Sequence, residues 1–151
     1  MKKAIRHNWF YDAPPEIVWE FLTTPELLAQ WLMPNDIKPV RGHSFMFRTK
    51  PYPQMGFDGN VYCEVLEARP FEKLIYSWKG GPGDGTFTLD SVVNWTMIQE
   101  NGGTKVFLDH DGFDTAGNQF GFESMNAGWK GMLEGKLGEL IAKKWASETA
   151  Q

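Results

Sequence analysis

The sequence lacks the features that mark several classes of protein. It contains one cysteine, Cys63, so a single chain can form neither a disulfide framework nor a cysteine-based metal cluster. It has no long basic run and a net charge of −4, which argues against a nucleic-acid partner. No apolar segment approaches the ~20 residues of a membrane span, and the basic N-terminus lacks the apolar run of a signal peptide. These absences predict a globular cytoplasmic protein that binds neither nucleic acid nor membrane.

Motifs for catalysis, phosphate binding and metal binding are also missing. The sequence has no nucleophile elbow, no HExxH and no CxxC. The segment GGPGDGT at 80–86 lacks the Gly-Lys-Ser/Thr ending of a phosphate loop. Asp109, Asp111 and Asp114 lack the further ligands and the closing glutamate of a calcium loop. We therefore predict no metal, no cofactor and no catalytic residue, although an acid–base pair assembled only by the tertiary fold stays open.

Aromatic side chains are abundant. They make up 15% of the residues, with seven Trp and eleven Phe. The 151 residues suit one domain, covering 1–151, and are enough to bury a core without disulfides. A core built from so many large rings packs irregularly around any space that is not filled.

The periodicity predicts a strand, two short helices, a run of strands and a long helix, in that order. The first strand covers about residues 4–11, and apolar residues at helical spacing follow over 17–22 and 27–32. The chain then alternates between apolar and polar residues in segments separated by turn residues: 45–47, 61–65, 74–78, 93–97 and 106–110. No long helical pattern interrupts them, which favours an antiparallel sheet. The long helix covers about residues 119–146.

Glycines at helical spacing interrupt this last helix. The segment GWKGMLEGKLG contains Gly128, Gly131, Gly135 and Gly138 on one side of the helix. Each glycine inside a helix costs about 1 kcal/mol relative to alanine, so the stripe requires a reason. We hypothesise that the missing side chains enlarge a ligand cavity. The alternative is that they let the sheet, or a second subunit in a homodimer, come unusually close.

Five segments resemble a known family in both order and spacing. They are APPEIVWEFLTTPELLAQWLMP, GHSFMFRTKP, GNVYCEVLEARPFEKLIYSW, VVNWTMIQENGGTKVFLDHDGF and AGWKGML. They are similar to the bacterial relatives of the C-terminal domain of the activator of the heat-shock-protein-90 ATPase, in the START-like (SRPBCC) superfamily. The resemblance extends from about Ala4 to Trp145. It implies an α+β helix-grip fold, in which a curved antiparallel sheet wraps a long C-terminal helix around an internal cavity for apolar or aromatic molecules.

The alternation and the resemblance together give a set of candidate cavity residues. The inward faces of the strands, the second short helix and the apolar stripe of the long helix supply Trp31, Phe45, Phe47, Tyr76, Trp78, Trp95, Met97, His110, Met125, Trp129 and Met132. Ligand pockets are mostly apolar with a few placed polar groups. The alternative is that these rings form a solid core, because close packing is the rule in protein interiors.

Two further features bear on such a cavity. His110 lies in DHDGFD, where it matches a histidine that recurs in the family, and it or Tyr76 could orient a ligand by a hydrogen bond. Alternatively, neighbouring side chains satisfy the histidine, as buried polar groups generally require. The flexible segments 51–57 and 80–86 are candidate gates at the cavity mouth.

We therefore expect a non-catalytic protein that binds an apolar, aromatic or lipid-like small molecule. A stress-related chaperone accessory is the first alternative, and it predicts an exposed apolar patch around Trp9, Phe10 or the Trp31–Met33 corner. A cavity-based enzyme of the cyclase or hydrolase type is the second alternative. It predicts a strongly shifted pKa inside the cavity.

Overall fold

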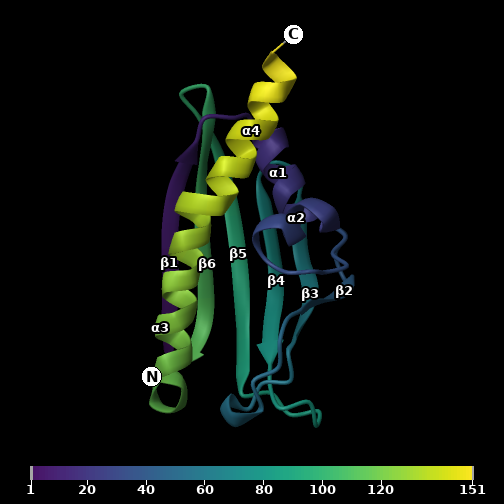
Figure 1. Cartoon of the computed structure of the whole chain (residues 1–151), viewed down its shortest axis with the longest axis vertical. Helices are drawn as coiled ribbons and strands as arrows, with labels where there is room; N and C mark the ends of the chain where they lie inside the picture. The colour runs from purple at the N-terminus through teal and green to yellow at the C-terminus, as the bar shows by residue number, and fades with distance from the viewer. Residues whose placement is uncertain (1, 151) are drawn as a thin grey trace.

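The computed structural model describes the backbone of residues 2–150 and the side chains of residues 3–54, 56–113 and 122–150. Six strands and a nearly continuous C-terminal helix account for most of the chain (Figure 1). In chain order the elements are β1 (Lys2–Tyr11), α1 (Pro15–Thr23), α2 (Pro25–Trp31), β2 (Ser44–Arg48), a short 3-10 turn (Pro53–Met55), β3 (Asn60–Arg69), β4 (Lys73–Gly80), β5 (Leu89–Glu100), β6 (Gly103–Asp114), α3 (Thr115–Gly131), a π-helical segment (Met132–Lys136) and α4 (Leu137–Thr149).

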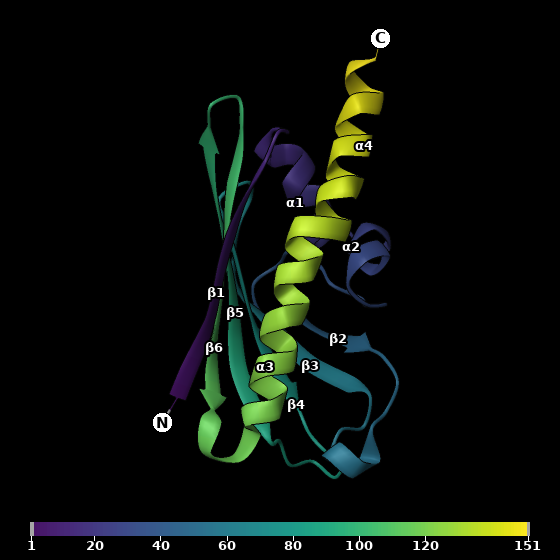
Figure 2. The same ribbon diagram turned by 60° about the vertical axis from the view of Figure 1, so that its left-hand side comes forward.

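The strands form one antiparallel sheet in the order β1-β6-β5-β4-β3-β2. The helix made of α3 and α4 crosses one face of this sheet, and α1 and α2 lie beside α4 on the same face (Figures 1 and 2). The α+β helix-grip arrangement predicted from the sequence is therefore confirmed.

The core lies between the sheet and the helices. Every strand residue that the alternation directed inward is buried: Phe45, Phe47, Tyr76, Trp78, Trp95, Met97, Val106, Leu108 and His110. Neighbours of opposite parity, such as Asp109 and Asp111, face outward, where both carboxylates lie near the Arg6 guanidinium. Because side chains alternate with a period of two along a strand, the local pattern was enough to assign both faces.

The C-terminal helix departs from its prediction in two ways. It begins at Thr115, directly after β6, and not near Gln119. It also contains a π-helical turn, in which Leu137 N–H donates to the Met132 carbonyl, five residues earlier. The buried Tyr11 hydroxyl of β1 donates to the Leu133 carbonyl within this turn at 2.7 Å. The strand thus supplies a donor to the backbone where the helix departs from α geometry.

We predict that Tyr11→Phe lowers the free energy of unfolding by about 1–3 kcal/mol, because the Leu133 carbonyl then loses a buried partner. Urea denaturation of the variant and the wild type measures this difference. Tyr52→Phe is the control, since the Tyr52 side chain is 51% exposed and should change the stability little. Equal losses for both variants would contradict the structural role assigned to the Tyr11 hydroxyl.

Candidate functional site

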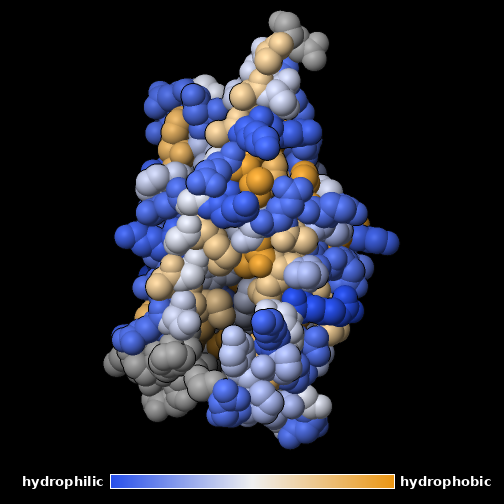
Figure 3. Space-filling view, in the orientation of Figure 1, coloured by the Kyte–Doolittle hydropathy of each residue, from blue (hydrophilic) through white to orange (hydrophobic). Residues whose placement is uncertain are grey.

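An apolar pocket opens between the first half of the long helix and the end of the sheet. Its volume is about 390 Å³, near the lower end of typical ligand pockets. It is lined by Leu32, Met33, Gly56, Phe57, Val61, Trp78, Gly80, Gly81, Thr88, Leu89, Met125, Trp129 and Met132. Figure 3 shows this face of the molecule hollowed beside α3, with hydrophobic residues along the hollow. Among the described residues of this lining no side chain carries a charge, and most side chains are apolar.

The two segments predicted as gates meet at this pocket. Gly56 and Phe57 come from one segment and Gly80 and Gly81 from the other, and all four line the pocket. The segments are joined by Asp58 N–H, which donates to the Gly81 carbonyl at 2.9 Å. The Asp58 carboxylate accepts the Tyr62 hydroxyl at 2.7 Å, and this hydrogen bond is the main cause that lowers the pKa of Asp58. The mouth of the pocket is therefore built from two loops joined by a backbone hydrogen bond, and the Asp58 side chain ties the first loop to Tyr62 of β3.

The candidate residues divide into two groups. Four of the eleven line the pocket: Trp78, Met125, Trp129 and Met132. The other seven are buried outside its lining: Trp31, Phe45, Phe47, Tyr76, Trp95, Met97 and His110. The sequence pointed to Phe57 only as part of the candidate gate 51–57, and it did not point to Leu89 at the start of β5 or to Thr88 beside it. Only the turn chemistry of 51–57 and 80–86, which marked candidate gates, could have suggested that neighbourhood.

Six of the seven residues outside the pocket lining are rings of a filled core, and Met97 is buried in the same core. Trp129 of α3 lies edge-on to Trp95 and tilted against Trp78, with ring centroids 5.6 Å apart in both pairs. Phe45 contacts Tyr76 at 5.3 Å in the same layer. These separations are ordinary for aromatic pairs in contact. The rings thus fill the middle of the molecule, and the free space is displaced toward the loops.

His110 is held by neighbouring groups on both sides of its ring. Trp129 Nε1–H donates to Nδ1 at 3.0 Å, and Ser91 Oγ lies 2.8 Å from Nε2. The Ser91 hydroxyl donates its own proton to the Trp78 carbonyl at 2.7 Å. The histidine must therefore carry its proton on Nε2 and donate it to Ser91. These hydrogen bonds occupy both nitrogens of the His110 ring, so neither nitrogen is free for a ligand while the bonds are intact.

Burial lowers the pKa of His110 to about 3. The ring is fully inaccessible to solvent, and desolvation disfavours its charged form. The neutral ring matches the hydrogen-bond chain, because an imidazolium could no longer accept from the Trp129 indole. The histidine serves as a neutral link between the helix and the sheet.

The helical glycines do not line the pocket. A Cβ atom added at Gly128, Gly131 or Gly135 would meet nothing within 4 Å. One at Gly138 would make ordinary contacts with the Tyr11 ring at 3.6 Å and the Leu133 carbonyl oxygen at 3.7 Å. The hypothesis that the stripe enlarges the cavity is therefore wrong for this pocket. Gly135 and Gly138 instead line a second hollow of about 370 Å³, between α4 and the end of β1.

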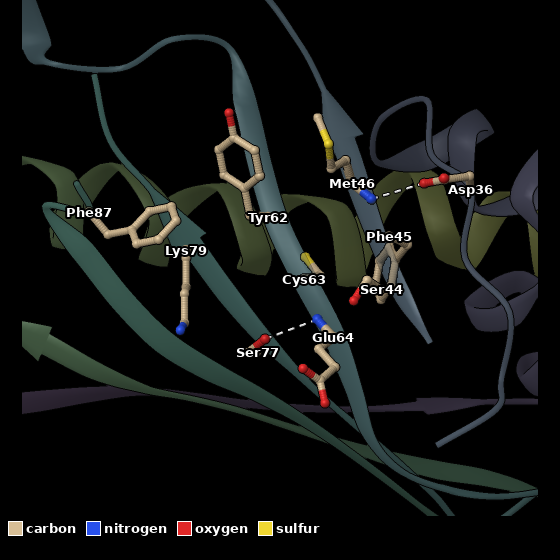
Figure 4. A pocket seen from close by; sticks show the side chains of 10 residues that line it. All are labelled: Asp36, Ser44, Phe45, Met46, Tyr62, Cys63, Glu64, Ser77, Lys79 and Phe87. Carbon is tan, nitrogen blue, oxygen red and sulfur yellow. Dashed lines mark hydrogen bonds between the residues drawn. The ribbon is translucent and has the colours of Figure 1, made fainter. Parts of the chain in front are cut away.

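A further hollow lies on the outer face of the sheet, over β2, β3 and β4 (Figure 4). Its side chains include Tyr62, Phe87 and Lys79, and the Tyr62 and Phe87 rings are 5.6 Å apart. Ser77 Oγ in its floor accepts the Glu64 backbone N–H at 2.9 Å. This hollow is shallow and mixes charged with apolar groups, so it resembles a ligand site less than the apolar pocket does.

Comparison with known proteins identifies the family. The model of the family described as Activator of Hsp90 ATPase homolog 1-like protein matches residues 12–142. The chain belongs to this family. Among curated proteins none matches the sequence significantly.

Solved structures agree with the family membership. Protein MLL2253 from Mesorhizobium loti is 31% identical, with a TM-score of 0.82, over 93% of this chain and 98% of that one. Protein BH1534 from Bacillus halodurans is 26% identical, with a TM-score of 0.70, over 92% and 96% of the two chains. The Aha1 dimer from Colwellia psychrerythraea shares the fold at 19% identity, with a TM-score of 0.69 over 87% and 90%.

The described part of the chain meets the requirements of neither a metal site nor a membrane-spanning helix. No group of three or more His, Cys, Asp or Glu side chains there is arranged to hold a metal ion, and the Asp114 side chain of the rejected calcium pattern lies outside that part. None of the described helices is both long and apolar enough to cross a membrane.

We predict that His110 makes the protein less stable as the pH falls from about 6.5 to about 3. The folded pKa lies below the ordinary value of 6.5, so the unfolded chain binds the proton first and is favoured by acid. The contribution approaches about 1.4 kcal/mol per pH unit inside this window. Urea denaturation at several pH values should show a shallower acid loss for His110→Gln than for the wild type. Identical slopes would refute the assignment. His43→Gln, whose hydrogen bond with the Asp36 carbonyl lies at the surface, is the control.

We predict that Gly131→Ala stabilises the protein by about 0.5–1 kcal/mol. The new methyl group enters open space, while alanine raises the helix propensity. Thermal unfolding of the variant measures the effect. Gly112→Ala is the contrasting control and should destabilise the protein. The φ of Gly112 is +114°, and an added Cβ would lie 2.8 Å from the Asp90 carbonyl oxygen, so the substitution is strained. Destabilisation by Gly131→Ala would show that the glycine stripe is covered in solution.

Proposed function

We propose that the protein binds a neutral apolar or aromatic small molecule in the pocket beside α3. The observation that carries this proposal is a lining whose described residues include no charged side chain, in which Trp78 and Trp129 offer rings and Met33, Met125 and Met132 offer flexible thioethers. Methionine adapts to irregular shapes and contacts aromatic faces favourably. The pocket therefore accommodates flat rings better than it accommodates a polar metabolite.

The polar groups near the pocket are few and sit at its mouth. The Thr88 hydroxyl lies 3.4 Å from the Gly80 carbonyl, and both residues belong to the lining. Backbone groups of the two joined loops supply the other hydrogen-bonding atoms. A ligand would thus bury its apolar part against Trp129 and present any hydroxyl or carbonyl group toward the loops. Each Å² of apolar surface buried contributes about 25 cal/mol before ordering costs.

The distribution of titratable groups favours binding over acid–base catalysis. Burial strongly raises the pKa values of the Tyr11, Cys63 and Tyr76 side chains and lowers that of His110. None of these four residues lines the apolar pocket. The enzyme hypothesis needs a perturbed group that faces the substrate, and the lining offers none among its described side chains.

A protein partner is the second candidate, and one observation favours it. Trp9 and Phe10, which point to opposite faces of β1, are each 39% exposed, and an accessory protein is expected to expose apolar side chains. The other corner suggested by the sequence does not provide such a patch, because Trp31 is buried and Leu32 and Met33 line the pocket. The family description refers to activators of a chaperone ATPase. A partner of that kind would meet the Trp9–Phe10 surface.

Native mass spectrometry of the freshly purified protein, followed by organic extraction, tests the first candidate directly. We predict a bound mass, or micromolar binding of the neutral dye N-phenyl-1-naphthylamine. Met125→Trp should weaken dye binding at least about tenfold, because the larger ring occupies the pocket itself. Leu140→Trp is the matched control, being half-buried on the same helix but outside the lining. A dye that binds Met125→Trp as well as wild type would place the ligand elsewhere.

A further inference from the structure

The two edge strands of the sheet, β2 and β1, differ in whether another segment of the chain covers their backbone. At the β2 edge, Met46 N–H donates to the Asp36 carboxylate at 2.9 Å (Figure 4) and Arg48 N–H donates to the Pro34 carbonyl at 3.0 Å. The segment around Asn35 therefore covers that edge. The ten-residue strand β1 forms the opposite edge (Figure 2). Within the described part of the chain, no hydrogen bond from outside the sheet reaches the backbone of residues 3–10.

The two halves of β1 differ in how well they resist pairing with another strand. The first half has an irregular register at Lys3 and Ala4, which discourages pairing. The second half, from Asn8 to Tyr11, has a regular register and no charge. It carries the exposed rings of Trp9 and Phe10. A free, regular and aromatic strand end is a surface on which another strand can pair.

The sequence of this strand end is complementary to itself. It reads RHNWFYD from Arg6 to Asp12, with a cation at one end, an anion at the other and Trp9 in the middle. Asp12 follows β1 directly, so when two such segments pair antiparallel about Trp9 and the pairing extends one residue past the strand, Arg6 of each copy falls opposite Asp12 of the other. Side chains directly opposite in this way are about 4.5–5.5 Å apart, and opposite charges there are stabilising. The charge order thus favours a second copy over an unrelated strand.

We propose that β1 is the interface of a homodimer, in which two copies pair antiparallel with Trp9 opposite Trp9 and their sheets become continuous. The hollow of about 370 Å³ beside Trp9, lined by Gly135 and Gly138 of the long helix, leaves space on the inner face for the second copy's indole. Gly135 contributes by lacking a side chain there, since an added Cβ would stand in open space. This dimer interface is a property separate from the proposed ligand binding and does not depend on it.

A charge exchange tests the pairing. Sedimentation equilibrium of the full chain should show a dimer for the wild type. Arg6→Asp alone and Asp12→Arg alone should each raise the dissociation constant about tenfold or more, because each places like charges opposite one another twice. The double variant should return it to near the wild-type value. This rescue is specific to the interface, since it does not restore the contact of Arg6 with Asp109 inside one chain. A monomeric wild type, or a double variant no tighter than the single ones, overturns the proposal.

A spin label gives a second measurement that leaves Arg6 and Asp12 unchanged. Asn8→Cys, made in a Cys63→Ser background and labelled with a nitroxide, puts two labels within a few residues of each other across the proposed pair. Strong dipolar broadening that is lost on dilution with unlabelled protein is expected. The same label at Leu66, an exposed strand residue on β3, should show none. Broadening at Leu66 but not at Asn8 would place the contact elsewhere and refute β1.

Discussion

The contact on which the rest of the structure depends is that of Trp129 with the sheet. This side chain is fully buried, and it is the point where the long helix meets strands from both halves of the sheet. Its indole N–H begins a series of hydrogen bonds that runs through His110 and Ser91 to the Trp78 carbonyl. The Trp129 ring packs on Trp78 and Trp95. A hydrogen bond fixes the orientation of a ring that dispersion alone would leave variable. The helix is thereby held at one depth and one rotation over the sheet.

The position of the pocket follows from this anchor. Trp129 and Trp78 present one side to the filled ring core and another to the pocket, so they form the wall between packed and open space. Toward α4, the buried side chains of Tyr11, Leu133 and Leu137 close the gap between the helix and the sheet. Toward the start of α3, the sheet ends in glycine-rich loops whose residues have little volume, among them Gly80 and Gly81. The apolar pocket therefore lies where the helix passes over the end of the sheet and its loops.

The sequence predicted the parts of this arrangement that are set locally. Period-two alternation assigned the inward faces of Phe45, Phe47 and Trp95 correctly, because a strand directs its side chains whatever its neighbours are. It did not reveal which inward residues would line free space, since that depends on how Phe57 and Leu89 fold against Met125 from distant parts of the chain. The partners of His110 are equally non-local, because Trp129 lies 19 residues later, on another element. The π-helical turn has no clear local signature either, and it coincides with a tertiary bond from Tyr11.

This π-helical turn joins the two surfaces to which we assign roles. Met132, its first residue, lines the apolar pocket, and Gly135, three residues later, lines the hollow beside Trp9. Between them, the Leu133 carbonyl receives the Tyr11 hydroxyl from the same strand end that carries Trp9. A helix with uninterrupted α geometry would rotate the residues after this turn relative to those before it, because a π turn adds one residue to the repeat. The bond from β1 therefore fixes the relative rotation of α3 and α4, so that the methionines face the pocket while the glycines face the edge strand.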